Sequence, residues 1–252
     1  MMSGLDQISQ GTFIRDLEFH AVLDSTNRRG MELAAVGVTE TPLMILAQRQ
    51  TAGRGRGSNQ WWSKDGALTF SLVLEASSCG LSPAALPQLS LLVGIAVGNA
   101  LAKLAPGTAV GLKWPNDVFL GRRKVCGILI ESVANYVVVG IGINVNNSFR
   151  DAPAELQEIG VACCDAVGKE LDLQQVLVAV LRAIPESIES HTNELSGAWR
   201  RRCILTGRTV AVSAGTNTTV GVCQGIDDQG ALLLLHEGQL HRCVAGVVSE
   251  IR

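Results

Sequence analysis

The stretch Tyr136-Val137-Val138-Val139-Gly140-Ile141-Gly142-Ile143-Asn144-Val145 predicts a strand more clearly than any other, because most of its side chains are β-branched. A dinucleotide-binding fingerprint would need a third glycine where Val145 stands, and a helix after it. The chain also has no G-x-x-x-x-G-K-[ST] phosphate loop. Gly140 and Gly142 therefore indicate a strand against which another backbone packs closely.

The segments around this strand predict both strands and helices. Strands are expected at 43–46, 68–75, 110–114, 118–120 and 125–130, with the last two forming a hairpin around Gly121-Arg122-Arg123. Helices are expected after the cap residues 24–27, from Ser82-Pro83 to Leu104, and from Leu173 to Leu195 with a kink at Pro185.

The chain changes character after about Cys203. Short apolar segments at 209–212, 220–222, 231–235 and 244–251 are separated by turns such as Asp227-Asp228-Gln229-Gly230. This pattern predicts a small β module, barrel-like in form. We therefore expect an α+β fold with a mixed α/β domain over residues 1–203 and a β domain over residues 204–252.

Composition excludes several classes of protein. Apolar residues make up 47% of the 252 residues and the formal net charge is -2, so a core can be buried and no global basic field attracts nucleic acid or a membrane. The N-terminus shows no signal peptide, and no apolar stretch is clean enough to span a bilayer. The seven cysteines form no C-x-x-C pair. We expect a cytoplasmic protein whose cysteines are small apolar fillers.

Two further motifs carry charge. In Gln50-Thr51-Ala52-Gly53-Arg54-Gly55-Arg56-Gly57, with Trp61 just downstream, glycines permit a close approach to a ligand and arginines suit carboxylate or phosphate. A solvated basic turn or an RNA-binding arginine-glycine segment is the alternative.

In Lys113-Trp114-Pro115-Asn116-Asp117, followed by Arg122-Arg123-Lys124, cations beside a carboxylate suit a polyphosphate. A tight turn with its charges in water is the alternative there.

Taken in order, these motifs resemble the biotin protein ligase family. The resemblance begins at Asp24-Ser25-Thr26-Asn27 and ends in a tail similar to the family's SH3-like domain. It implies a mixed sheet flanked by helices, like that of class II aminoacyl-tRNA synthetases, and a C-terminal SH3-like β-barrel. It also implies that biotin and ATP, with Mg²⁺, form biotinyl-5′-AMP, and that a lysine of a biotin carboxyl carrier protein, by default that of acetyl-CoA carboxylase, takes up the biotin.

The resemblance also implies roles for individual residues, while the Mg²⁺ ligands stay unnamed. Catalytic roles fall to Lys124, Arg54, Arg56, Asp117 and Lys113. Biotin binding falls to Ser25, Thr26, Asn27, Gln50, Arg54, Gly55, Arg56, Trp61 and Lys124. ATP or adenylate binding falls to Arg54, Arg56, Lys113, Asn116, Asn144 and Arg252.

Two departures from the family qualify these expectations. Ser58-Asn59-Gln60 stands where bacterial relatives often carry basic residues, so an adenylate contact is expected to be missing or replaced. The first motif begins at residue 24, which leaves no room for a winged-helix DNA-binding domain, so we expect no repressor function and no nucleic-acid or membrane partner. A monomer and a homodimer both stay open.

Rival functions share parts of this pattern. A lipoate or octanoate ligase or transferase has the same fold but would carry a different glycine-rich loop. A non-catalytic biotin or nucleotide sensor would not need Arg54, Arg56 and Lys124 together. A nucleic-acid-binding module is disfavoured by the net charge and the few aromatic residues.

Overall fold

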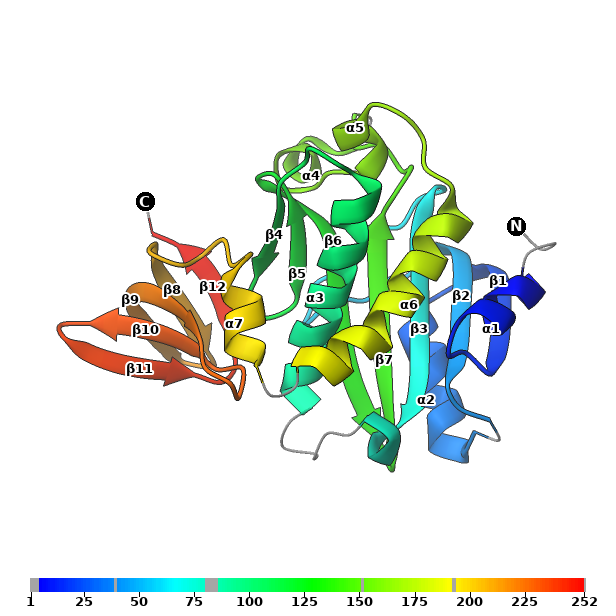
Figure 1. Ribbon diagram of the computed structural model, residues 1–252, viewed down its shortest axis with the longest axis horizontal. Helices are drawn as coiled ribbons and strands as arrows, with labels where there is room; N and C mark the ends of the chain where they lie inside the picture. The colour runs from blue at the N-terminus through cyan, green and yellow to red at the C-terminus, as the bar shows by residue number, and fades with distance from the viewer. Residues whose placement is uncertain (1–4, 39, 80–85, 151, 192–193, 252) are drawn as a thin grey trace.

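A computed structural model describes residues 5–38, 40–79, 86–150, 152–191 and 194–251. Its main element is a seven-stranded sheet with the order β1-β2-β3-β7-β6-β5-β4 (Figure 1). β1 and β2 pair in parallel through the crossover helix α2 (Thr26–Val36), and the other neighbouring strands pair antiparallel. The strands are β1 (Asp16–Leu23), β2 (Leu43–Gln50), β3 (Ala67–Glu75), β4 (Val110–Lys113), β5 (Asp117–Leu120), β6 (Arg123–Val133) and β7 (Tyr136–Asn144).

β7 lies in the middle of this sheet and shows how its two faces differ. Its odd-numbered residues from 137 to 143 are buried in the larger hydrophobic core. On the opposite face Val138 packs with Ala34 of α2 in a smaller cluster. Because side chains alternate along a strand, that second face continues with Gly140 and Gly142. This face of β7 therefore carries an apolar side chain under α2 and no side chains at the two glycines beyond it.

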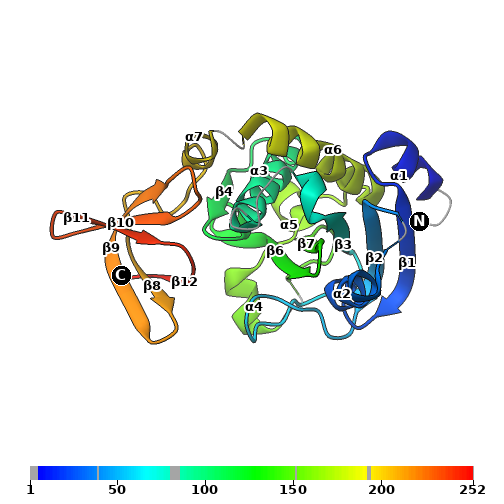
Figure 2. The same cartoon turned by 90° about the horizontal axis from the view of Figure 1, so that it is seen from below.

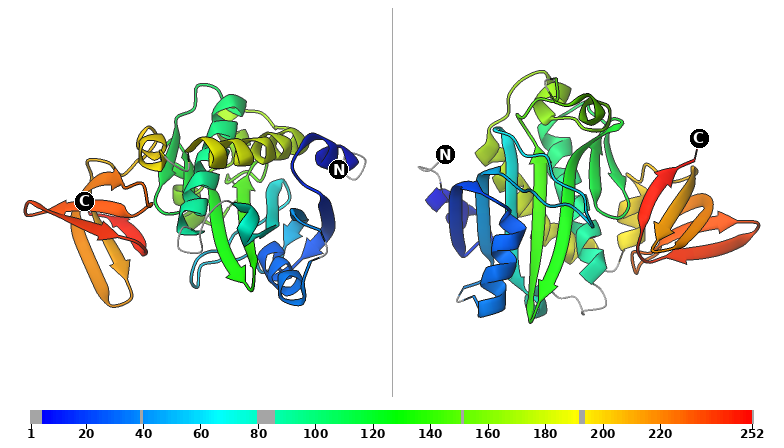
Figure 3. Two further views of the ribbon diagram at one scale, coloured as in Figure 1. Left: turned by 60° about the horizontal axis from the view of Figure 1, so that its bottom comes forward. Right: turned by 180° about the vertical axis from the view of Figure 1, so that it is seen from behind.

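Helices cover the two faces of the sheet unequally. α3 (Leu86–Leu104) and α6 (Leu173–His191) pack together over one face, while α2 covers only part of the other (Figures 2 and 3). The loop between β2 and β3 crosses the part that α2 leaves open (Figure 3). The remaining helical segments are α1 (Leu5–Gly11), η2 (Ala76–Cys79), α4 (Ala154–Ile159), α5 (Cys163–Val167) and α7 (Leu195–Arg200).

A second sheet stands beside the β4 edge of the first (Figure 1). Its antiparallel strands follow the order β11-β10-β9-β8-β12. Leu112 of β4 forms an isolated bridge with Cys203 ahead of this sheet, and the indole Nε1 of buried Trp114 donates to Gly230 O at 3.0 Å. Its strands are β8 (Thr209–Ala214), β9 (Asn217–Ile226), β10 (Leu232–His236), β11 (Gln239–Cys243) and β12 (Val247–Glu250).

The structure confirms most of the expected elements and corrects several. The helix expected over Leu173–Leu195 runs through Pro185 but ends at His191. A separate helix, α7, starts at Leu195 and packs against both α3 and β9 of the second sheet. The last strand begins at Val247, not at 244, and the sequence patterns do not predict β1 or β11. Ser82-Pro83 lies outside the described residues.

The barrel expected for the C-terminal part is not found as a closed sheet in the described ranges. Among the described residues, the second sheet has β11 and β12 at its edges, and no pairing closes it into a barrel. In the same part of the chain no helix combines the length and apolar character needed to cross a bilayer. The buried cysteines, such as Cys223, contain free thiols.

We expect the contact between Trp114 and Gly230 to hold the second sheet against the first. Trp114→Phe keeps a ring but leaves the buried Gly230 carbonyl without its donor, so the free energy of unfolding should fall by about 1–3 kcal/mol. Trp199→Phe is the matched control, because Trp199 is fully buried and its indole N–H has no partner among the described residues. Urea unfolding that shows equal losses for both variants would contradict this role of Trp114.

Candidate functional site

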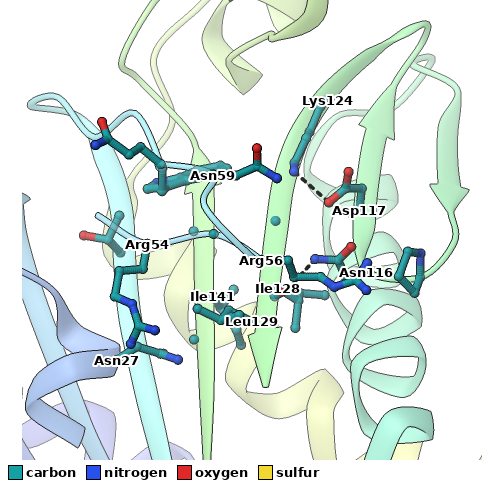
Figure 4. A pocket seen from close by; sticks show the side chains of 18 of the residues that line it. Asn27, Arg54, Arg56, Asn59, Asn116, Asp117, Lys124, Ile128, Leu129 and Ile141 are labelled. Atoms are coloured by element: carbon teal, nitrogen blue, oxygen red, sulfur yellow. Dashed lines mark hydrogen bonds and ion pairs between the residues drawn. The ribbon is translucent and has the colours of Figure 1, made fainter. Parts of the chain in front are cut away.

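A cavity of about 430 Å³ lies on the part of the main sheet that α2 leaves open. The β2–β3 loop and the β5–β6 hairpin contribute to its walls (Figure 4). Val247 and Val248 of strand β12 in the second sheet also line it. Its lining includes these expected site residues: Ser25, Thr26, Asn27, Gln50, Arg54, Gly55, Arg56, Trp61, Lys113, Asn116, Asp117 and Lys124. The fold thus brings residues from distant parts of the chain to one place.

The floor of the cavity is formed by glycines on adjacent strands. Gly127 of β6 is paired directly with Gly142 of β7. A Cβ at Gly142 would collide with the indole of Trp61, and a Cβ at Gly140 would collide with the Asn27 amide. The expectation of close packing at these glycines is confirmed, but side chains rather than a backbone make the approach.

A buried polar network occupies the α2 end of the cavity; it consists of Thr26, Asn27, Gln50 and Ser71. Gln50 Oε1 accepts from Thr26 N at 2.7 Å and from Thr26 Oγ1 at 3.1 Å. Ser71 Oγ lies 2.8 Å from Thr26 Oγ1 and 2.7 Å from Asn27 Oδ1. Ser25 caps α2 by accepting from Arg28 N at 3.4 Å. The network ties the first turn of α2 to β2 and β3.

The two arginines of the glycine-rich loop point in different directions (Figure 4). Arg54 points toward Asn27 and binds Glu131 through its two terminal guanidinium nitrogens, Nη1 and Nη2, at 2.9 and 2.8 Å. Arg56 points toward Asn116 and donates from Nη1 to Gly246 O at 3.2 Å. Arg54 therefore has a carboxylate partner, whereas Arg56 has no ion pair among the described residues.

Arg56 lies where its charge is poorly solvated. Burial lowers the pKa of its guanidinium, while the charge of Asp117 acts in the opposite direction. An arginine stays protonated in a protein, so burial cannot neutralise its charge. Burial therefore favours the binding of an anion beside the guanidinium. Arg56 is thus the cation of the loop that is best placed to meet one.

Strands β4 and β6 supply the other two cations, Lys113 and Lys124. Lys124 Nζ lies 2.7 Å from Asp117 Oδ1 (Figure 4) and 5.9 Å from the centre of the Trp61 ring system. A register shift between Val118 and Phe119 lets Asp117 and Lys124 meet across the two strands. Lys113 Nζ lies 6.0 Å from the Phe119 ring centre.

The remaining expected residues are placed as follows. Asn116 donates from Nδ2 to Ile128 O at 2.6 Å, so its amide braces the hairpin. Asn144 is buried, accepts from Asn147 at 2.9 Å, and lines a second cavity of about 730 Å³ that shares Trp61 and Lys124 with the first. Arg252 lies outside the described residues.

The sequence patterns do not predict several residues of the site. Glu131 ends the apolar run of β6 and gives no signal except that a carboxylate stands in a strand. Ser71 is hidden among apolar residues of β3. At the departure from the family pattern, Asn59 and Gln60 both line the first cavity.

The site contains no reactive thiol and no metal cluster among the described residues. Cys126 is buried beside Lys124, and burial raises the pKa of its thiol, so it stays protonated. In the same ranges no three His, Cys, Asp or Glu side chains gather as a metal would require. The polar lining of the cavity consists of cations, amides, hydroxyls and the carboxylate of Asp117.

Gly142→Ala tests the glycine floor. The added methyl overlaps the Trp61 indole, so the ring and its loop must move away. We expect a clear shift of the Trp61 indole ¹H–¹⁵N resonance, which Trp61→Phe identifies by its loss. Gly197→Ala is the control, because a Cβ there has no neighbour within 4 Å. An unshifted resonance in Gly142→Ala would show that the floor does not position the ring.

Two family models match this chain. Residues 19–147 match the Biotin/lipoate A/B protein ligase family, and residues 205–249 match the Biotin protein ligase C terminal domain. The two matches fall on the two sheets of the structure.

Individual relatives agree with these models. The bifunctional ligase/repressor BirA of Bacillus subtilis is 33% identical over 228 residues, which cover 86% of this chain and 69% of the relative. The biotin–[acetyl-CoA-carboxylase] ligase of Mycobacterium tuberculosis is 32% identical over 97% of this chain and 92% of the relative. The solved biotin protein ligase of Aquifex aeolicus in complex with biotin and ATP is 32% identical, with a TM-score of 0.83 over 95% of this chain and 100% of that one. The chain therefore belongs to the biotin protein ligase family.

Proposed function

We propose that this protein activates biotin with ATP and transfers the biotinyl group to a lysine of a biotin carboxyl carrier protein, by default that of acetyl-CoA carboxylase. The observation that carries the proposal is the polarity of the cavity. One end offers the neutral polar network, and the other offers Arg56, Lys113 and Lys124. Biotin has the same polarity, with a neutral ureido ring at one end and a carboxylate at the other.

The ring end of biotin fits the polar network. Asn27, Thr26 and Gln50 offer both donors and acceptors, as a ureido group requires. The glycine floor lets the Trp61 indole and the Asn27 amide lie against β6 and β7, and these two side chains form part of the surface that the ring end of biotin would meet. This assigns the network to substrate recognition.

The cationic end supports adenylate formation. A carboxylate oxygen of biotin attacks the α-phosphorus of ATP, and pyrophosphate leaves, so two anions must approach each other. Arg56, Lys113 and Lys124 offset that repulsion and stabilise the charge that grows on the phosphoryl oxygens. Arg54 orients the loop, and Mg²⁺ enters with the nucleotide substrate.

The second cavity suits the nucleotide. It opens from the first at Lys113 and Lys124, and it is lined by Asn144 and by Arg208 of the second sheet. Arg208 Nη1 is held at 2.7 Å by Glu250 Oε2. We assign Asn144 to the adenylate side, as the resemblance implies, with Asn116 bracing the wall and Arg252 reaching the phosphates.

Transfer to the carrier follows in the same place. The lysine amine attacks the acyl carbon of biotinyl-5′-AMP, AMP leaves, and the amine loses a proton. Asp117, held by Lys124, is the carboxylate that accepts or orients that proton. The structure thus supports two steps with one set of side chains.

We further propose the setting in which the reaction occurs. Residues 1–203 form the catalytic domain, and residues 204–252 form an SH3-like domain that completes one wall of the site. The protein acts in the cytoplasm, without a nucleic-acid or membrane partner and without repressor function. The contribution of Val247 and Val248 to the cavity supports a wall supplied by the second domain, and the net charge of -2 argues against a nucleic-acid or membrane partner.

The decisive experiment is a biotinylation assay. The protein is incubated with ATP, Mg²⁺, biotin and an apo biotin-carrier domain, and the carrier is weighed by intact mass spectrometry. We expect the mass of one biotinyl group to be added, and Lys124→Ala to slow this by about a hundredfold or more.

Different outcomes have different meanings. A lipoyl or octanoyl adduct, formed only when those acids are offered, would move the protein to the lipoate branch of the fold. Tight biotin binding without any adduct would identify a sensor. An unchanged rate in Lys124→Ala would contradict the role assigned to Lys124.

A further inference from the structure

We propose that Glu131 is a positioning residue for biotin: its carboxylate orients both Asn27 at the ring end of the cavity and Arg54 in the glycine-rich loop. The inference rests on the proposed function, since it assigns a role in binding the same substrate. Glu131 lies on β6 opposite Val138 of β7, just where α2 stops covering the sheet.

Both carboxylate oxygens of Glu131 are occupied. Oε1 accepts from Arg54 Nη2 at 2.8 Å, and Oε2 accepts from Arg54 Nη1 and from Asn27 Nδ2, both at 2.9 Å. The three residues come from the start of α2, the loop and β6. One side chain therefore links the two segments that close around the ring end of the cavity.

The contact with Glu131 determines which way the Asn27 amide faces. An ionised carboxylate only accepts hydrogen bonds, so Asn27 must present its NH₂ group to Glu131. Its Oδ1 then faces the buried Ser71 hydroxyl, 2.7 Å away, whose single proton must be donated to it. The absence of a Cβ at Gly140 gives the Asn27 amide the space that it occupies beside Glu131. Glu131 thus sets which donors and acceptors the network shows to a ligand.

The same carboxylate holds the loop over the cavity. Arg54 forms an antiparallel bridge with Gln60, and Trp61 N donates to Gly53 O at 2.9 Å, so the loop is a small hairpin. The bidentate pair with Glu131 attaches one side of that hairpin to the sheet. Arg56 points the other way, donates to the Gly246 carbonyl and has no ion pair among the described residues, so its charge is available to an anion.

The test is Glu131→Gln, which keeps the shape but removes the charge and adds an NH₂ group. That group can face Asn27 Oδ1 and turn the amide around. We expect the KM for biotin in pyrophosphate release to rise at least tenfold, with kcat within about threefold of wild type. Biotin binding by calorimetry, without ATP, should weaken by the same factor.

Glu18→Gln is the matched control. Glu18 binds Arg29 through two nitrogens, at 2.8 and 3.2 Å, and its side chain has an exposure of 27% against 22% for Glu131, but it lies on the outer strand β1 away from the cavity. We expect this variant to keep the wild-type KM. Thermal unfolding of both variants shows whether a change in KM merely follows a loss of folded protein.

A second measurement separates positioning from a general effect on folding. In a double-mutant cycle, Glu131→Gln should weaken biotin binding much less when Asn27 is already replaced by alanine, because the residue acts through that amide. Equal factors in both backgrounds would overturn the proposal, as would an unchanged KM in Glu131→Gln. Wild-type protein that releases no pyrophosphate with biotin would instead refute the proposed function.

Discussion

The site depends on three positions where the central strands carry no side chain. Gly127, Gly140 and Gly142 interrupt a sheet face that is apolar under α2, and the space they leave admits the Asn27 amide and the Trp61 indole. Every other part of the cavity is arranged around that bare backbone. A methyl group at Gly142 would remove the surface on which Trp61 lies, and Trp61 in turn contacts Lys124.

Charge is distributed unevenly around this floor. Glu131 neutralises Arg54, and Asp117 pairs with Lys124. Arg56 has no such partner among the described residues, and burial lowers its pKa. Among the described cations that line the cavity, Arg56 and Lys113 have no ion pair. Of these two, Arg56 has its pKa lowered by burial, and an electrostatic interaction with an anion is stronger at a poorly solvated charge. The paired groups, Arg54 with Glu131 and Lys124 with Asp117, hold the neighbouring side chains in place, and each pair contributes no net charge to the site.

The second sheet completes the site rather than standing apart from it. Its Gly246 carbonyl accepts from Arg56, its Gly230 carbonyl accepts from Trp114, and Val247 lines the cavity. The Trp114 contact shows that a residue inside a charged motif serves the interface between the sheets. An explanation of Lys113-Trp114-Pro115-Asn116-Asp117 by phosphate binding alone would therefore be incomplete.

The sequence by itself determined the central strand, the glycine-rich loop, the order of the motifs and the family, because β-branched runs, glycines and ordered motifs are local properties of a chain. The edge strand β1, the end of α6 and the role of Glu131 were decided only by the tertiary structure. β1 depends on pairing with β2, and α7 on packing against both α3 and β9. Glu131 acquires its role from Asn27 and Arg54, which are 104 and 77 residues away, and such contacts arise only when the chain is folded.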